Sequence, residues 1–160
     1  MSGESRTAGL MQTAAEMVEV CAVELGSSRF GVPIAHVVEI IGSTSPQPVP
    51  LAPEFVGGLV HYRGDVLTTV SLRRLLGMPD AQGPKSVLVL EHPGGCFGLQ
   101  VDAVKEVLTV RATDYEPNPC TLNDRRKGIY AGAYKLKDGL LVMLDALRLE
   151  PMRLSAARTA

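Results

Sequence analysis

The chain has 160 residues and a formal net charge of −1; hydrophobic residues make up 46% of it, aromatic residues 4%, and Trp is absent. This length fits one domain or two small subdomains that share a core, and the near-zero charge gives no electrostatic reason to bind nucleic acid. There is neither an apolar run of about 18 residues nor a signal-peptide pattern, so we expect a cytoplasmic protein that does not insert into a membrane.

The cysteines and histidines lack the spacing of a metal site or a disulfide framework. No CxxC pair occurs among Cys21, Cys96 and Cys120, and no histidine has a ligand spacing with a thiol or carboxylate. We therefore expect reduced thiols, no metal and no cofactor. His92 and Cys96 flank a tight turn, which leaves a small thiol enzyme as a remote alternative.

Short alternating or apolar runs, separated by Gly- and Pro-rich turns, predict many short strands and no long amphipathic helix. In the first half we expect a disordered tail over 1–16, strands over 18–25, 29–34 and 37–41, a proline-rich loop over 43–53, a strand over 58–62 and a capped helix over 71–77. In the second half we expect strands over 87–90, 97–101 and 104–109, a loop over 114–128, and strands over 129–136 and 140–144. A short helix near 145–149 and a tail over 151–160 close the chain. This pattern is typical of small β-barrels.

Two segments of the chain are repeated. Residues 30–41 read FGVPIAHVVEII and residues 97–108 read FGLQVDAVKEVL, an offset of 97 − 30 = 67. The stretches that begin at Gly58 and Gly132 both contain two apolar runs around a turn, Arg63-Gly64 in the first and Asp138-Gly139 in the second. Because each copy of a repeat is expected to be one structural unit, we divide the domain into pseudo-repeats of approximately 17–85 and 86–150.

The stretch FVGGLVHYRGDVLTTVSLRRLLG over residues 55–77 resembles the CheW-like chemosensory coupling proteins, whose turn usually reads Asn-Leu-Arg-Gly. FGLQVDAVKEVL and the closing GAYKLKDGLLVMLDALRL resemble the same family, so the likeness covers roughly residues 17–150. It implies a mainly β fold of two five-stranded SH3-like barrels side by side, with short helical turns. This chain departs from the pattern at His61 and Tyr62, and at Thr68 and Ser71, where the family often has Pro and Asp.

The resemblance implies a non-enzymatic scaffold that couples the cytoplasmic tip of a chemoreceptor to the regulatory domain of the histidine kinase CheA, recruited to membrane-bound receptor arrays. Because His61 and Tyr62 depart from the pattern, a second reading stays open. It is a receptor-binding adaptor of a non-flagellar pathway, serving a pilus or biofilm, that does not activate the kinase.

By the same resemblance, Val37, Glu39, Val87 and Val107 line the receptor-facing groove, although valines in strands are equally what a core contains. Glu39 stands among aliphatic residues, so its carboxylate must face water, a cation or a partner.

Arg63 is expected to be exposed in a hairpin turn, where its guanidinium offers a bidentate fork to a partner's carboxylate. The alternative is an arginine that is simply solvated. Gly98 either is structural or lets a partner's backbone approach closely. The structural turn residues are expected to be Gly64, Asp138 and Gly139.

Overall fold

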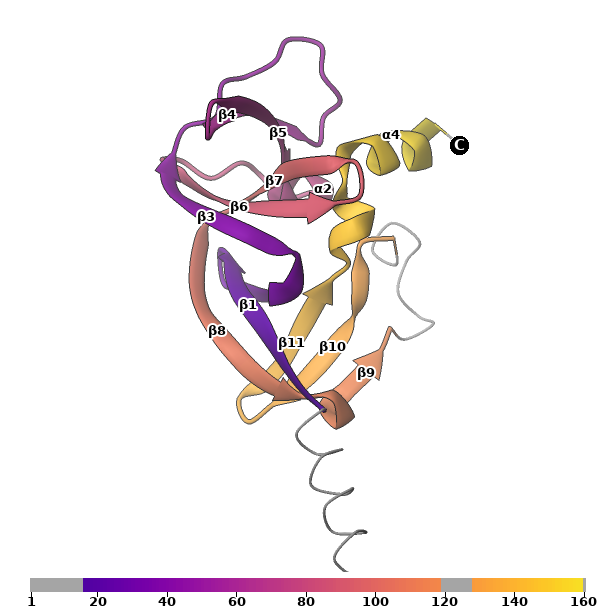
Figure 1. Ribbon diagram of the computed structural model, residues 1–160. Helices are drawn as coiled ribbons and strands as arrows, with labels where there is room; N and C mark the ends of the chain where they lie inside the picture. Colours follow the sequence, from indigo (N-terminus) through magenta and orange to yellow (C-terminus); the bar gives the residue numbers. More distant parts are fainter. Residues whose placement is uncertain (1–15, 119–127, 160) are drawn as a thin grey trace, which may run out of the picture.

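The computed structural model describes residues 16–118 and 128–159, which form two β-sheets with short helical segments (Figure 1). The disordered tail predicted over residues 1–16 lies, apart from Glu16, outside the described residues. The strands are β1 Met17–Leu25, β2 Ser28–Pro33, β3 Val37–Thr44, β4 Val56–Tyr62, β5 Asp65–Ser71, β6 Lys85–His92, β7 Gly95–Val101, β8 Ala103–Arg111, β9 Tyr115–Pro117, β10 Tyr130–Leu136 and β11 Gly139–Leu144. The helical segments are η1 Ile34–His36, α2 Leu72–Leu75, η2 Ala112–Asp114, η3 Ala146–Leu149 and α4 Pro151–Thr159.

One sheet, here called the β1 sheet, has the strand order β8-β1-β2-β11-β10-β9; the other, the β6 sheet, has the order β3-β6-β7-β5-β4. In Figure 1 most of the β1 sheet lies in the lower part of the molecule and most of the β6 sheet in the upper part. The mainly β prediction is confirmed, and the β1 sheet has one short strand, β9, beyond the five expected. None of the described helices is long and apolar enough to span a membrane.

Each sheet takes strands from both copies of the repeat. β1 pairs with β8, so that Cys21 lies opposite Val107, and β3 pairs with β6, so that Ile40 lies opposite Leu88. The β1–β2 hairpin therefore shares its sheet with β10 and β11 of the second copy, and β6–β7 shares a sheet with β4 and β5 of the first. The expectation that each copy forms its own structural unit is wrong, because the first hairpin of each copy lies in one sheet and all its later strands lie in the other.

The local structure does repeat. The hairpins β4–β5 and β10–β11 both carry a bulge, at Gly58 and at Gly132. The strands β5 and β11 both run parallel to the second strand of the other copy's first hairpin, β7 and β2 respectively. At Gly58 the backbone φ is +119°, and a Cβ would lie 2.6 Å from the Gln47 carbonyl oxygen. Only glycine fits this close approach of two backbones.

Strands that run between two cores explain the long apolar runs of the sequence. In β6, Val87 and Val89 face the core of the β6 sheet, whereas Leu88 and Leu90 face a larger core shared by both sheets. Side chains alternate along a strand, so a strand buried on both faces is apolar at every position. The third cluster, inside the β1 sheet, consists of Val20, Val110, Tyr134, Leu141 and Met143.

The helix predicted after β5 is present. The Ser71 hydroxyl accepts a hydrogen bond from the Arg74 N–H at 3.3 Å, which caps α2, and Gly77 after its end has a φ of +74°. The tail predicted over 151–160 is instead helix α4 up to Thr159. The Glu150 carboxylate accepts hydrogen bonds from the N–H groups of Met152 and Arg153 at 2.9 and 3.0 Å, and thereby caps its first turn.

The turn of the second hairpin lies one residue earlier than predicted. Leu136 pairs with Gly139, so Lys137 and Asp138 are the central residues and Gly139, with a φ of +138°, begins β11. Gly139, which indicated this turn in the sequence, is therefore the first residue of β11. Asp138 makes an ion pair with Arg29 at 3.5 Å.

Candidate protein-binding site

Arg63 lies at the tip of the β4–β5 hairpin. Tyr62 pairs with Asp65, which makes Arg63 and Gly64 a two-residue turn, and their φ values of +49° and +83° are those of a type I′ turn. A left-handed backbone costs a residue with a Cβ about 1 kcal/mol or more. The turn therefore presents Arg63 where glycine or asparagine would be less strained, with its side chain 71% exposed.

Glu39 meets Arg63 from the opposite edge of the β6 sheet. β3 and β4 are the two edge strands of this sheet, and the Arg63 Nη2 and Glu39 Oε1 atoms lie 3.6 Å apart. The Glu39 side chain is 41% exposed, so water screens the pair and its contribution to stability is small. The structure thus brings together two of the residues predicted for binding and leaves both accessible.

The ring of Tyr62 lies beneath Arg63. The Arg63 Cζ atom is 5.3 Å from the centre of the ring, within the range of a cation–π contact. The ring packs against the core of the β6 sheet, next to Ile41. Burial raises the pKa of the Tyr62 hydroxyl; the Arg63 charge opposes this rise and the Glu39 carboxylate adds to it.

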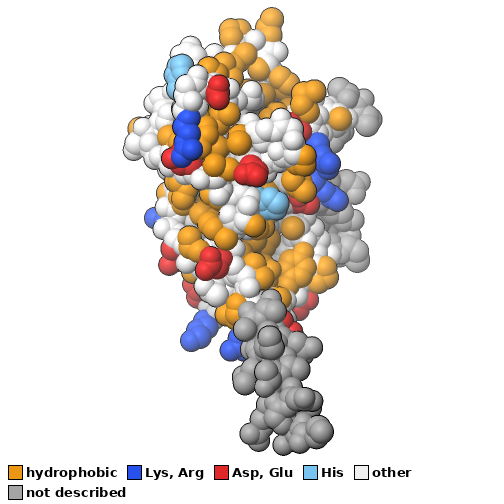
Figure 2. Space-filling model, viewed as in Figure 1, with side chains coloured by type: hydrophobic (Ala, Val, Ile, Leu, Met, Phe, Trp, Pro, Cys, Tyr) orange, Lys and Arg blue, Asp and Glu red, His pale blue; other side chains and the backbone are white. Residues whose placement is uncertain are grey.

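Exposed apolar side chains lie on the same strand as Glu39. Val38 and Ile40, its neighbours in β3, are 40% and 45% exposed. Because side chains alternate along a strand, they point away from the face that carries Glu39. Figure 2 shows hydrophobic side chains distributed over the face that β3 crosses, with separate charged groups among them. The edge strand β3 thus offers a partner two surfaces: one with the Glu39–Arg63 charges, which can set orientation, and one with exposed apolar side chains, whose burial can supply affinity.

The predicted valines with surface access, Val37 and Val107, lie on different strands. Val37 is half-buried and packs against the shared core. Val107 is 53% exposed, on the edge strand β8 of the β1 sheet. Val107 and Glu39 therefore belong to different sheets.

Val87 and Gly98 lie in the interior, contrary to the expectation that they face a partner. Val87 has no exposed surface. A Cβ on Gly98 would lie 2.7 Å from Val87 Cγ1 and 2.9 Å from Thr69 Cγ2. The glycine is therefore needed for packing between β5, β6 and β7, and the structural alternative holds for both residues.

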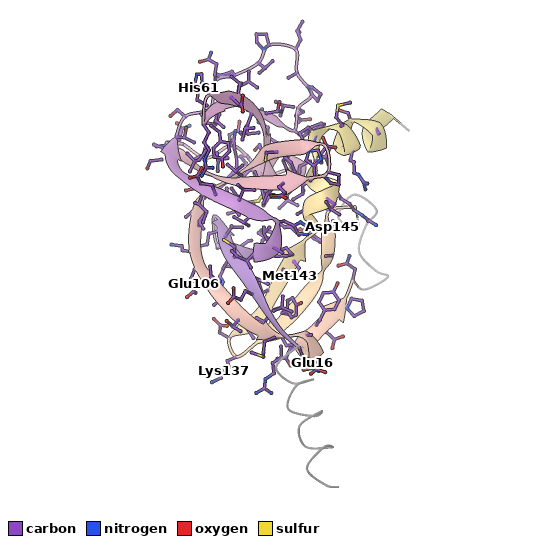
Figure 3. The ribbon with its side chains drawn as sticks, viewed as in Figure 1. Glu16, His61, Glu106, Lys137, Met143 and Asp145 are labelled. Carbon is purple, nitrogen blue, oxygen red and sulfur yellow. The ribbon has the colours of Figure 1, made fainter. Side chains whose placement is uncertain are left out.

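The predicted turns are at opposite ends of the molecule. In Figure 3, His61, two residues before Arg63, marks the upper end. Lys137, which occupies the position of Arg63 in the second hairpin, marks the lower end. Glu106, the counterpart of Glu39 in the repeat, lies on β8 at one side and belongs to neither turn. The repeat has therefore not produced two equal sites.

His92 and Cys96 do not form the dyad that a thiol enzyme requires. His92 packs against Phe97 with 5.7 Å between ring centres, and its Nε2 lies 4.0 Å from Glu150 Oε1. Because side chains alternate along β7, Cys96 faces away from Phe97 and is exposed.

Tyr62, Val38 and Ile40 are the residues that sequence reasoning missed. The alternation of Val60 and Tyr62 in β4 places both on one face of the strand. That alternation does not reveal that the Tyr62 hydroxyl is buried without a partner, because this depends on the distant strand β3.

Comparisons with known proteins agree with this architecture. The family model for the CheW-like domain matches residues 19–151. A chemotaxis protein CheW from Rhizobium meliloti is 32% identical over 129 residues, which are 79% of this chain and 83% of the relative. A second, from Helicobacter pylori, is 29% identical over 131 residues, 81% of this chain and 79% of the relative.

The crystal structure of the scaffolding protein TtCheW from Thermoanaerobacter tengcongensis superposes with a TM-score of 0.72 at 24% sequence identity, covering 80% of this chain and 88% of that one. This likeness establishes the fold as two SH3-like barrel subdomains. The family model covers most of the chain, and the Rhizobium relative matches along most of both sequences. The chain therefore belongs to the CheW-like family of chemosensory scaffold and adaptor proteins.

Proposed function

We propose that this protein is a non-enzymatic scaffold that joins the cytoplasmic tip of a chemoreceptor to the regulatory domain of the histidine kinase CheA. The observation that carries the proposal is the separation of accessible surfaces on one rigid body. Arg63 and Glu39 lie on the β6 sheet, while Val107 lies on the β1 sheet. Two partners can bind such a body at once without competing for the same side chains.

The mechanism is thermodynamic linkage. When both partners bind, any difference in affinity between the active and inactive receptor is passed to the kinase, and the coupling is reciprocal. The shared core supports this role, because it packs side chains from both sheets, such as Cys21 of β1 and Leu88 of β6, into one cluster. The protein acts in the cytoplasm and is recruited to membrane-bound receptor arrays, without a cofactor, metal or nucleic acid.

A second candidate is a receptor-binding adaptor of a non-flagellar pathway that does not activate the kinase. The presence of Tyr62 directly beneath Arg63 favours it, because an aromatic ring there changes the surface from that of the usual turn. Both candidate functions use the same surface of this protein to bind the receptor, and they differ in whether the kinase is recruited and activated.

Sedimentation of receptor cytoplasmic fragments with this protein and CheA from the same organism tests both. For a coupling scaffold, the kinase sediments with receptor only when this protein is present, and its phosphorylation rate changes. For the adaptor, this protein sediments while the kinase stays in solution or inactive. If this protein binds neither, the proposed function is wrong.

A further inference from the structure

The Tyr62 hydroxyl is a buried polar group without a hydrogen-bond partner in the described part of the chain. A phenol hydroxyl can both donate and accept, and burying it unpaired costs free energy. Such groups are few in native proteins, and each requires a physical reason.

The group closest to offering a partner is Glu39. Its carboxylate lies close enough to the Tyr62 hydroxyl to raise the pKa of that group, after burial, through its charge and through hydrogen bonding. The two groups nevertheless fall short of full hydrogen-bond geometry. Instead Glu39 faces Arg63 through a long, exposed contact of 3.6 Å. The Glu39 carboxylate therefore lies between the Arg63 guanidinium, with which it makes a weak ion pair, and the Tyr62 hydroxyl, which has no full hydrogen bond among the described residues.

Arg63 is arranged to exchange its partner. Its guanidinium lies over the Tyr62 ring, and this contact does not use its N–H groups, which can point at a carboxylate in a fork. A carboxylate arriving from a partner protein would place a like charge beside Glu39, and like charges in contact are strongly unfavourable. Glu39 must then either move or find another donor.

We propose that Tyr62 determines the specificity of this site: when an acidic side chain of the receptor takes Arg63, Glu39 turns away and accepts a hydrogen bond from the Tyr62 hydroxyl. This inference rests on the proposed function for the identity of the partner. A phenylalanine or leucine at position 62 would bind the same partner more weakly, because neither can receive the displaced carboxylate.

The exchange can be tested on the protein alone, because Arg63→Ala frees Glu39 from Arg63 just as the binding of a partner's carboxylate would. In the natural background, Tyr62→Phe keeps the ring under Arg63 and removes only an unpaired hydroxyl, so the melting temperature stays the same or rises by about 1–3 °C. In the Arg63→Ala background Glu39 is free to accept from the hydroxyl, so Tyr62→Phe lowers the melting temperature by about 2–4 °C. The sign of the effect reverses between the two backgrounds.

Tyr134→Phe is the matched control, since Tyr134 is a buried tyrosine in the other sheet and has no contact with this pair. Its effect must be the same in both backgrounds, because distant substitutions add. If Tyr62→Phe also changes the melting temperature by the same amount in the natural and the Arg63→Ala backgrounds, Glu39 does not exchange Arg63 for Tyr62.

The second measurement is binding of a fluorescent receptor cytoplasmic fragment. Tyr62→Phe should weaken binding about 5- to 20-fold through the lost hydrogen bond, with no loss of stability. Equal affinity of Tyr62→Phe and the natural protein would overturn the proposal. If the natural protein does not bind the fragment, the proposed function fails, and the melting temperatures still decide whether Glu39 exchanges partners.

Discussion

Arg73 and Asp102 form a two-pronged ion pair that fastens one sheet to the other. Arg73 Nε and Nη2 donate to the two oxygens of Asp102 at 2.8 and 2.6 Å, and the Gly26 N–H donates to the same carboxylate at 2.7 Å. Arg73 is on α2, after the β6 sheet's strand β5, whereas Gly26 is in the β1–β2 turn of the β1 sheet. Asp102 itself stands where the chain crosses from β7 to β8, so this single carboxylate ties three segments.

We expect Asp102→Ala to lower the free energy of unfolding by about 2 kcal/mol, because it removes three hydrogen bonds and leaves the charge of the half-buried Arg73 without a carboxylate. Urea titration measures this. Asp138→Ala is the control: its ion pair with Arg29 is 3.5 Å long and Asp138 is 72% exposed, so the loss should stay below about 0.5 kcal/mol. Equal losses in the two variants would contradict the role given to Asp102.

The same ion pair predicts how stability depends on pH. The hydrogen bond from Arg73 lowers the pKa of Asp102; burial opposes this, and the Gly26 N–H lowers the pKa further. The folded pKa is therefore below the unfolded value of about 3.9. The stabilisation is complete above about pH 4 and is lost as the pH falls through the folded pKa. Asp102→Asn should flatten the fall of the unfolding free energy at acid pH; an unchanged slope would rule this out. Arg74 lowers the pKa of Asp80 in the same way, so some slope should remain.

Gly98→Ala should destabilise the protein by about 1–3 kcal/mol, because the added methyl group meets Val87 and Thr69 at under 3 Å. Gly42→Ala is a matched control, since a Cβ there has no neighbour within 4 Å. Thermal unfolding of the two variants compares them directly. A neutral Gly98→Ala would mean that the core of the β6 sheet relaxes around the methyl group.

Arg63→Glu should weaken receptor-fragment binding about tenfold or more, since it places two carboxylates together where a partner's acid must dock. The melting temperature should change little, because the side chain is 71% exposed. Lys137→Glu makes the same charge change at the matching position of the other hairpin and should leave binding intact. Fluorescence anisotropy measures both, and a loss with Lys137→Glu instead would move the site to the opposite end.

Leu154→Ala should cost about 2 kcal/mol or more, because Leu154 of α4 is 7% exposed and belongs to the shared core. Met152→Ala, in the same helix but 76% exposed, should be close to neutral. Urea titration of both variants tests whether α4 is a packed part of the domain. No difference between the two would mean that residues after Glu150 behave as the tail that the sequence predicts.

Local structure was accessible from the sequence because it depends on neighbouring residues. The alternation of β4, the Arg63-Gly64 turn and the Ser71 cap all have short-range physical causes, and the structure confirms them. Pairing between distant strands was not accessible. β3 and β8 carry the same repeated pattern, so nothing in either strand favours a partner within its own copy over one in the other.

At the candidate site, too, features with a local cause could be predicted from the sequence and features that depend on distant strands could not. Exposure of Arg63 follows from its turn, but the burial of Val87 depends on β6 having a core on each face. Helix α4 was missed because its sequence, PMRLSAART, has no apolar stripe, and among residues 151–156, whose burial the structure describes, Leu154 alone belongs to the core.

The crossing of β3 and β8 between the sheets has a consequence for synthesis on the ribosome. Cys21 of β1 can pair only after Val107 of β8 has been synthesised, which is 107 − 21 = 86 residues later. At about 10 residues per second this leaves the apolar edge of β1 open for several seconds. A gene split between the two copies would yield one fragment without β6 and β7, the interior of the β6 sheet, and one without β1 and β2, the interior of the β1 sheet. We therefore expect neither fragment to complete its sheets until it meets the other. The interleaving of the two copies in both sheets thus predicts that the two halves, expressed separately, assemble into the native domain when mixed.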